Sequence, residues 1–127
     1  MKIGIISDIH SNIYAFKACT EYMEKHKCDE YFFLGDYISD TPYTRETMDY
    51  LYEFMEKLPD ALKPGGRVAI LTFHSGEDKL VKKALKAGYK AGIYSDYARD
   101  VVRPSAQECA QNGRARSTKM RWAVKAE

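Results

Sequence analysis

Residues 3–12 read IGIISDIHSN, a short apolar run that ends in the polar residues Asp8, His10 and Asn12. An apolar run bounded by turn-forming residues is typical of a buried parallel strand. In open α/β sheets, binding and catalytic residues collect at the carboxyl ends of such strands. The stretch therefore predicts an α/β fold in which Asp8 and His10 lie at a functional edge of the sheet.

Two further apolar runs end in residues that could join this edge. Asp36 follows the second run and His74 follows the third. If the strands are parallel neighbours, the carboxylates and imidazoles converge, and such ligands suit Zn, Mn or Fe. We therefore expect a divalent metal on Asp8, His10, Asp36 and His74, with His10 and His74 as candidate catalytic residues. The open alternatives are an empty site and a His74 that only faces a loop.

Residues 7–12 (SDIHSN) and 34–36 (LGD) resemble the calcineurin-like metallophosphoesterases, and the resemblance covers about residues 1–53. In that family the first Asp and His hold one metal ion, and the Asp of Gly-Asp bridges two. The resemblance implies a metal-dependent phosphoesterase whose metal activates a water molecule. The family's later motifs, Gly-Asn-His and Gly-His-x-His, are absent from the sequence, so four expected ligand positions have no counterpart.

A second resemblance covers about residues 54–127 and rests on residues 62–67 (LKPGGR), 73–78 (FHSGED), 103–105 (RPS) and 114–121 (RARSTKMR). These motifs resemble the carboxyl end of the S-adenosylmethionine-dependent family that methylates N4 of a cytidine in small-subunit ribosomal RNA. The resemblance implies a place near the cytidine for Glu77 and Asp78, and capping of a helix is the alternative. No Gly-x-Gly loop follows the first strand, so we expect no S-adenosylmethionine and rank methyl transfer last.

The charge distribution also divides the chain. Residues 1–53 carry 5 Lys/Arg and 10 Asp/Glu, whereas residues 54–127 carry 15 and 8. This change in charge near residue 53, together with the two resemblances, predicts that the chain is a chimera. Fusion, engineering or computational generation would each produce such a chimera. The basic part suggests contacts with RNA phosphates, and a solvated strand edge that discourages aggregation is the alternative. The candidate residues for RNA contact are Arg114, Arg116, Lys119 and Arg121.

The elements expected along the chain form a single domain over residues 1–127. We expect a three-layer, Rossmann-like α/β domain with helices on both faces of a mostly parallel sheet. The sheet has about five strands in the order 1-2-3-5-4, and the last strand is antiparallel. Strands are expected at residues 3–6, 31–34 and 68–73, near Val101, and at 118–124. Helices are expected near residues 12–26, 44–62, 75–88 and 105–112. The third and fourth of these begin with the capping patterns Ser75 to Asp78 and Ser105 to Glu108.

The composition bounds the function classes. The hydrophobic fraction of 45% and charged fraction of 30% are typical of a soluble globular protein. The sequence contains no membrane span or signal peptide, and its three cysteines lack metal-type spacing, which predicts a cytoplasmic protein. Three hypotheses follow in order: a scaffold or protein-binding domain with incomplete catalytic sites, a weak metal-dependent phosphoesterase, and an RNA-binding module.

Overall fold

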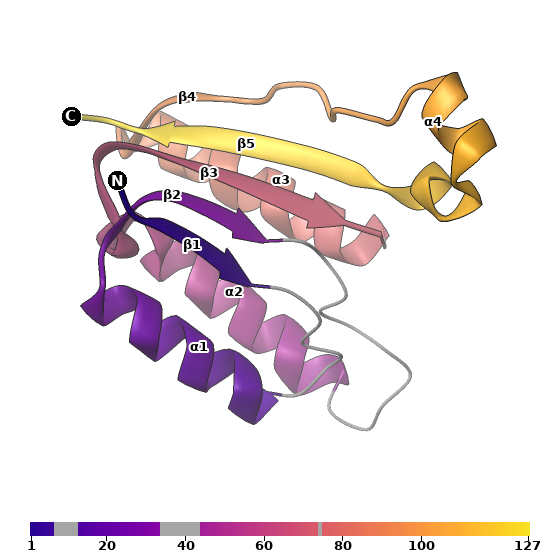
Figure 1. Ribbon diagram of the computed structural model, residues 1–127. Helices are drawn as coiled ribbons and strands as arrows, with labels where there is room; N and C mark the ends of the chain where they lie inside the picture. Colours follow the sequence, from indigo (N-terminus) through magenta and orange to yellow (C-terminus); the bar gives the residue numbers. More distant parts are fainter. Residues whose placement is uncertain (7–12, 34–43, 74) are drawn as a thin grey trace.

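A computed structural model describes residues 1–6, 13–33, 44–73 and 75–127 of the chain (Figure 1). The elements in chain order are β1 (Ile3–Ile6), α1 (Ile13–Lys25), β2 (Cys28–Phe33), α2 (Thr44–Ala61), β3 (Leu62–Thr72), α3 (Ser75–Lys90), β4 (Tyr94–Tyr97), α4 (Ala106–Gln111), the 3-10 helix η1 (Gly113–Ser117) and β5 (Lys119–Lys125).

The five strands form one sheet in the order β1-β2-β3-β5-β4, which confirms the predicted order. β1, β2 and β3 pair in parallel, and β5 lies antiparallel between β3 and β4. The expected position of the fourth strand was wrong, because β4 is formed by Tyr94–Tyr97. Val102, next to the expected position, makes only an isolated bridge to Met120.

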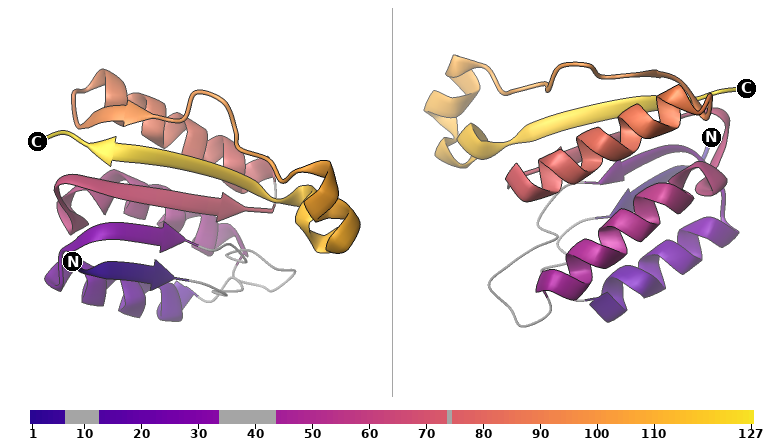
Figure 2. Two further views of the ribbon diagram at one scale, coloured as in Figure 1. Left: turned by 45° about the horizontal axis from the view of Figure 1, so that its top comes forward. Right: turned by 180° about the vertical axis from the view of Figure 1, so that it is seen from behind.

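The three long helices lie on the same face of the sheet, as both views of Figure 2 show. The expectation of three layers with helices on both faces was therefore wrong. The reason is topological: β1, β2, β3 and β4 advance across the sheet in one direction, and right-handed crossovers then place every connecting helix on the same side. In the part of the chain that the structure describes, the other face carries no long helix.

The hydrophobic core fills the space between this single helix layer and the sheet. Tyr31, Val68 and Ile70 point from β2 and β3 into the core, and each is at most 1% exposed. From the helices they meet Leu51, Phe54, Leu58, Val81 and Leu85, which are all at most 2% exposed. Burying a side chain of this size contributes roughly 1.5–3 kcal/mol, so the core can fix the sheet against the helices.

The helix ends show which local signals were informative. At α4 the predicted N-terminal cap at Ser105 is confirmed, because the Glu108 backbone N–H donates to Ser105 Oγ at 3.1 Å. α3 was expected to end at Gly88 but continues to Lys90. Its end is a Schellman motif, in which Gly92 has a φ of 80° and the Ile93 N–H donates to the Gly88 carbonyl at 2.9 Å.

Gly88 has a packing role inside α3. A Cβ added there would lie 2.4 Å from Cδ2 and Cε2 of Tyr94, a residue that is 3% exposed. We expect Gly88→Ala to lower the free energy of unfolding by about 1–3 kcal/mol in urea titrations, because overpacking outweighs the helix propensity of Ala. Gly113 has no atom within 4 Å of such a Cβ, so Gly113→Ala is the control and should change little. A stabilised Gly88→Ala would contradict the close packing.

Candidate functional site

The carboxyl ends of β1, β2 and β3 share one edge of the sheet, and α3 begins at the same edge (Figure 1). Four residues expected here, Asp8, His10, Asp36 and His74, lie outside the described residues. Among the residues that the structure does describe, no group of three or more His, Cys, Asp or Glu side chains could hold a metal ion. The described part of this edge therefore offers basic groups and no metal-binding cluster.

Basic residues reach this edge from η1 and the start of β5. Arg116 is exposed on η1, and Lys119 is half-buried at the first position of β5. Lys119 pairs with Thr72, the last residue of β3, which fixes it at the carboxyl edge. Arg114 belongs to η1, but its side chain is outside the described part. Two of the four predicted RNA-contact residues are thus placed at the edge where α/β proteins bind ligands.

Arg121 has a different position from the one expected. Its Nε donates to Asp78 Oδ1 at 2.8 Å and its Nη2 donates to Asp78 Oδ2 at 3.1 Å. The side chains of Arg121 and Asp78 are only 7% and 14% exposed. Because this guanidinium is buried between β5 and α3, it cannot reach an RNA phosphate, and the expectation for Arg121 was wrong. Its two-point contact with Asp78 is a structural link between the sheet and α3.

The first turn of α3 also holds Glu77, which is fully buried at 0% exposure. The resemblance implied that Glu77 and Asp78 lie near a target base, with helix capping as the alternative. The structure assigns Asp78 to the ion pair with Arg121 instead. No sequence pattern indicated this pair, because its partners are 43 residues apart.

The carboxylates with shifted pKa values lie at the opposite edge. The Lys2 backbone N–H, which donates to Asp29 at 2.7 Å, lowers the pKa of that carboxyl at the start of β2. The Arg99 guanidinium, 2.6 Å from Asp96, lowers the pKa of that carboxyl on β4. Both groups are held ionised by their partners, so neither is suited to exchange a proton near neutral pH.

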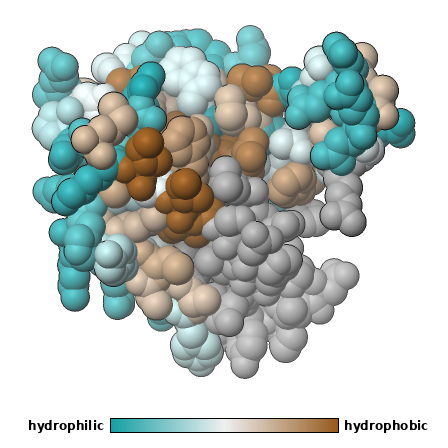
Figure 3. Space-filling model, viewed as in Figure 1, coloured by the Kyte–Doolittle hydropathy of each residue, from teal (hydrophilic) through white to brown (hydrophobic). Residues whose placement is uncertain are grey.

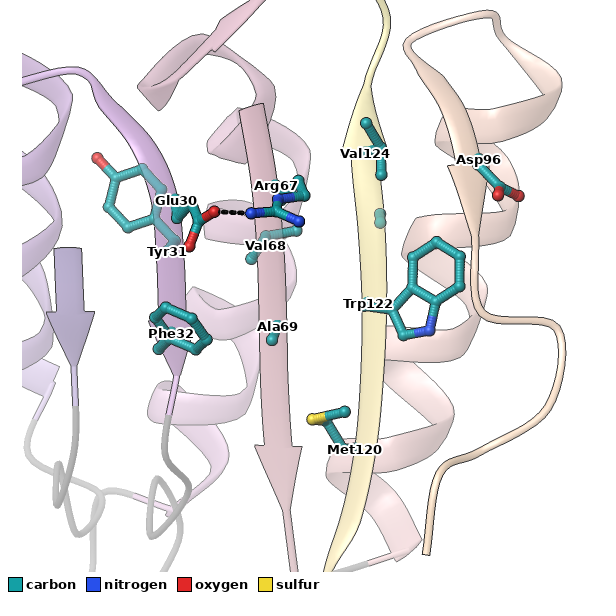
Figure 4. Close-up of a pocket in the computed structure, with 11 residues that line it drawn as sticks. Glu30, Tyr31, Phe32, Arg67, Val68, Ala69, Asp96, Met120, Trp122 and Val124 are labelled. Atoms are coloured by element: carbon teal, nitrogen blue, oxygen red, sulfur yellow. Dashed lines mark hydrogen bonds and ion pairs between the residues drawn. The ribbon is translucent and has the colours of Figure 1, made fainter. Parts of the chain in front are cut away.

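A cavity of about 620 Å³ lies between β1 and α1, and one of about 460 Å³ lies between α2 and α3. A shallow hollow of about 490 Å³ lies on the face of the sheet away from the helices, between β2 and β4 (Figure 4). None of these three cavities is at the carboxyl edge. The described helices also include none that is long and apolar enough to cross a membrane.

Comparisons with known proteins favour the second resemblance. The model of the MraW methylase family matches residues 44–126, and that of the calcineurin-like phosphoesterases matches residues 1–72. Ribosomal RNA small subunit methyltransferase H 1 of Agathobacter rectalis is 90% identical over 79 residues, which are 62% of this chain and 23% of that protein. The protein of the same name from Lachnoclostridium phytofermentans is 68% identical over 78 residues, 61% of this chain and 21% of its own length.

The chain therefore spans less than a quarter of the length of these two curated relatives. Among solved structures, a methyltransferase from Pyrococcus furiosus is similar with a TM-score of 0.42 and 19% identity, over 78% of this chain and 41% of that one.

These findings correct four expectations. Methyl transfer was ranked last, but the family and the relatives named above are methylases. S-adenosylmethionine was not expected, yet it is the methyl donor of the family in the second resemblance. The expectation of a metal-binding protein is corrected by the same matches to methylases, and its four candidate ligands lie outside the described residues. An engineered or computationally generated origin is wrong, because a bacterial protein is 90% identical over 79 residues.

The two family models overlap on residues 44–72, but only the methylase model continues through α3, η1 and β5. That part contains every described basic residue placed at the carboxyl edge above. The two relatives named above match about three fifths of the chain, and both are called ribosomal RNA small subunit methyltransferase H 1. The chain belongs to the MraW methylase family.

Proposed function

We propose that this chain acts in the S-adenosylmethionine-dependent methylation of small-subunit ribosomal RNA. The observation that carries the proposal is the 90% identity over 79 residues to a protein named for that activity. The activity belongs to relatives about four times as long as the matched segment, so the chain contributes one part of the machinery. We assign to this part the contact with the RNA backbone.

The position of the basic residues supports an RNA contact. Arg116 and Lys119 lie at the carboxyl edge of the sheet, and Arg103 is exposed on the segment that leads to α4. Guanidinium and ammonium groups bind phosphate oxygens, and each contact releases counterions from the nucleic acid. Contacts of this kind position an RNA without reading its sequence, so specificity requires other parts of the machinery.

The described residues do not form a cradle for S-adenosylmethionine. The three cavities lie away from the carboxyl edge. The first turn of α3 has one partly exposed carboxylate, Asp78, and this group is already bound to Arg121. We therefore assign no step of the methyl transfer to any of the residues that the structure describes.

The proposal is tested with small ribosomal subunits and S-adenosylmethionine that carries a labelled methyl group. We expect the purified chain to bind the small-subunit RNA in a filter assay, and to promote incorporation of label once a longer relative supplies the part of the machinery that binds S-adenosylmethionine. An Arg116→Ala/Lys119→Ala variant should weaken both, because two phosphate contacts are lost. Absence of both binding and incorporation at low salt would contradict the proposal.

Salt dependence separates phosphate contacts from a general loss of positive charge. For single-stranded RNA the slope of log K against log salt should fall in magnitude by about 1.4 in Arg116→Ala/Lys119→Ala, about 0.7 for each phosphate. The control is Lys82→Ala/Lys86→Ala, which removes the same charge from exposed positions of α3. An equal effect of the two double variants would show that RNA senses only the net charge.

A further inference from the structure

Three side chains stack on one another beside β4, the strand at one outer edge of the sheet. The guanidinium carbon of Arg99 lies 5.0 Å from the ring centre of Tyr89 and 4.7 Å from that of Tyr97. The two ring centres are 5.0 Å apart, and the ring planes are inclined by 44°. Tyr89 is in the last turn of α3 and Tyr97 ends β4, so the stack joins the helix layer to the sheet. We call these three residues the stacked cluster.

The guanidinium of Arg99 is held in one orientation by two further contacts. Its Nη1 donates to Asp96 Oδ1 at 2.6 Å and to the Tyr97 carbonyl at 2.8 Å. The Arg99 side chain is nevertheless 53% exposed, and Tyr89 is 39% exposed. The stacked cluster is therefore a flat, accessible and already ordered group, which loses little further freedom when a planar ligand stacks on it.

The charge of the stacked cluster favours a flat, neutral ligand over a phosphate. Asp96 compensates the positive charge of Arg99, and a phosphate would meet that carboxylate. Unpaired nucleobases, in contrast, stack on guanidinium planes and on aromatic rings. Hydrophilic residues form most of the upper edge of Figure 3, where β4 and the segment after it lie, and hydrophobic residues gather nearer the middle of this view. The stacked cluster is thus set in a polar surface, which fits a nucleic acid better than an apolar protein partner.

The segment after β4 runs beside β5 toward α4 (Figure 1). Hydrogen bonds of 2.9 Å from the Ala98 and Val102 backbone N–H groups to carbonyls of β5 fix it there. Arg103 is exposed on this segment, one residue after the second of these bonds. The segment therefore forms a track that leads from the stacked cluster to the basic residues of the carboxyl edge.

The track has the length of a few nucleotides. Tyr97 pairs with Ala123, and Lys119 lies four residues before Ala123 on β5, so the two ends of the track are roughly 14 Å apart. A stacked strand advances about 3.4 Å per nucleotide, so about four nucleotides cover this distance. Alternation along β5 also places Tyr97 and Lys119 on the same face of the sheet. One RNA strand can therefore reach both ends.

We propose that the stacked cluster binds one unpaired base of a single-stranded RNA whose phosphates lie along the track. The base stacks on the exposed guanidinium of Arg99, and Tyr89 and Tyr97 position that group. This inference rests on the RNA contact of the proposed function and adds to it a separate site for a base. Every base has a flat π face, so this site holds an unpaired nucleotide without reading its identity.

The test compares a single-stranded RNA with a duplex of the same sequence. The strand has about ten nucleotides, within the usual footprint of a single-strand binding site. It carries the fluorescent base 2-aminopurine at one position, which is varied from one oligonucleotide to the next. In the duplex the bases are already stacked and paired, so only phosphate contacts remain. We expect the emission of at least one position to change when the wild-type chain binds the single strand.

Arg99→Lys is the main variant, because it keeps the charge and removes the planar group. We expect it to weaken the binding of the single strand about 5-fold or more and to leave duplex binding unchanged. The salt slope should also be unchanged, since stacking releases no counterions. Arg67→Lys is the matched control: Arg67 is also paired with a carboxylate, and its side chain is 66% exposed against 53% for Arg99. It should bind both RNA forms as the wild type does.

Two substitutions of Tyr89 test whether its ring positions the guanidinium. Tyr89→Ala should weaken the binding of the single strand and remove the change in 2-aminopurine emission. Tyr89→Phe keeps the ring and should behave as the wild type. Far-UV circular dichroism checks that each variant is folded.

Equal binding of the single strand by wild type and Arg99→Lys, with Arg116→Ala/Lys119→Ala still weakened, would overturn this inference and leave the proposed function standing. An equal loss in Arg99→Lys and Arg67→Lys would overturn it as well. Absence of any binding by the wild type at low salt would overturn both proposals. A loss that is confined to Arg99→Lys and Tyr89→Ala supports the site, even where no methyl group enters the ribosomal RNA.

Discussion

Asp78→Ala is expected to lower the free energy of unfolding by about 3–5 kcal/mol, because it leaves the buried Arg121 guanidinium without its carboxylate. The remaining charge has few other partners, since Arg121 Nη1 is buried and makes no hydrogen bond. Urea unfolding followed by circular dichroism measures the loss. The same substitution also removes the ion pair that links α3 to β5. The cooperativity of the unfolding transition is therefore a second measurement.

The exposed pair of Glu53 and Lys57 provides a matched control. Its atoms are 3.2 Å apart, but both side chains are more than half exposed. Glu53→Ala should change stability by at most about 0.5 kcal/mol, because water replaces the lost contact. A loss below about 1 kcal/mol for Asp78→Ala would contradict the burial of the pair.

Alkaline unfolding is the second large effect. Burial raises the pKa of Tyr31 and of Tyr94 well above the ordinary value near 10, and Cys28 adds to the shift of Tyr31. A raised pKa means that the folded state holds the proton more tightly. The stability is therefore complete below about pH 10 and is lost as the pH rises toward the folded pKa. Above about pH 10, each tyrosine lowers the free energy of unfolding by about 1.4 kcal/mol per pH unit. The two together therefore lower it by about 5 kcal/mol by pH 12.

Single phenylalanine variants separate the two contributions. The Tyr94 hydroxyl is buried and makes no hydrogen bond, so Tyr94→Phe should leave stability at pH 7 unchanged or slightly higher. The Tyr31 hydroxyl donates to the Met23 carbonyl at 2.9 Å, so Tyr31→Phe should cost roughly 1 kcal/mol. Each variant should halve the slope of stability against pH above about 10. An unchanged slope in Tyr94→Phe would contradict a deeply buried hydroxyl.

Much of the sheet could be predicted from local patterns. The strand order, the antiparallel last strand and the helix cap at Ser105 follow from apolar runs, crossover rules and short side-chain spacing. The fourth strand escaped prediction because Tyr94–Tyr97 reads YSDY, which lacks an apolar run. Its strand conformation depends on pairing with β5, and such a long-range contact leaves no local signal.

Arg121 shows why part of the site was misjudged. Alternation along β5 identifies two faces but does not say which face meets the helices. We assumed that the face of β5 that carries Arg121 is exposed to solvent. This was wrong, because Asp78 compensates the charge of the buried Arg121 guanidinium. The low rank of methyl transfer rested on a missing glycine-rich loop, and an absent motif proved weaker evidence than the motifs present in residues 62–121.

The insertion of β5 between β3 and β4 has a consequence for folding during synthesis. β5 is the last of the five strands to leave the ribosome, yet it is the hydrogen-bonding partner of both neighbours. Until it emerges, one edge of β3 is without a partner, and β4 has no described strand to pair with. The nascent chain therefore carries open strand edges late in translation, when they can recruit other chains. We expect the slow step of folding to be the pairing of β5 with β3 and β4.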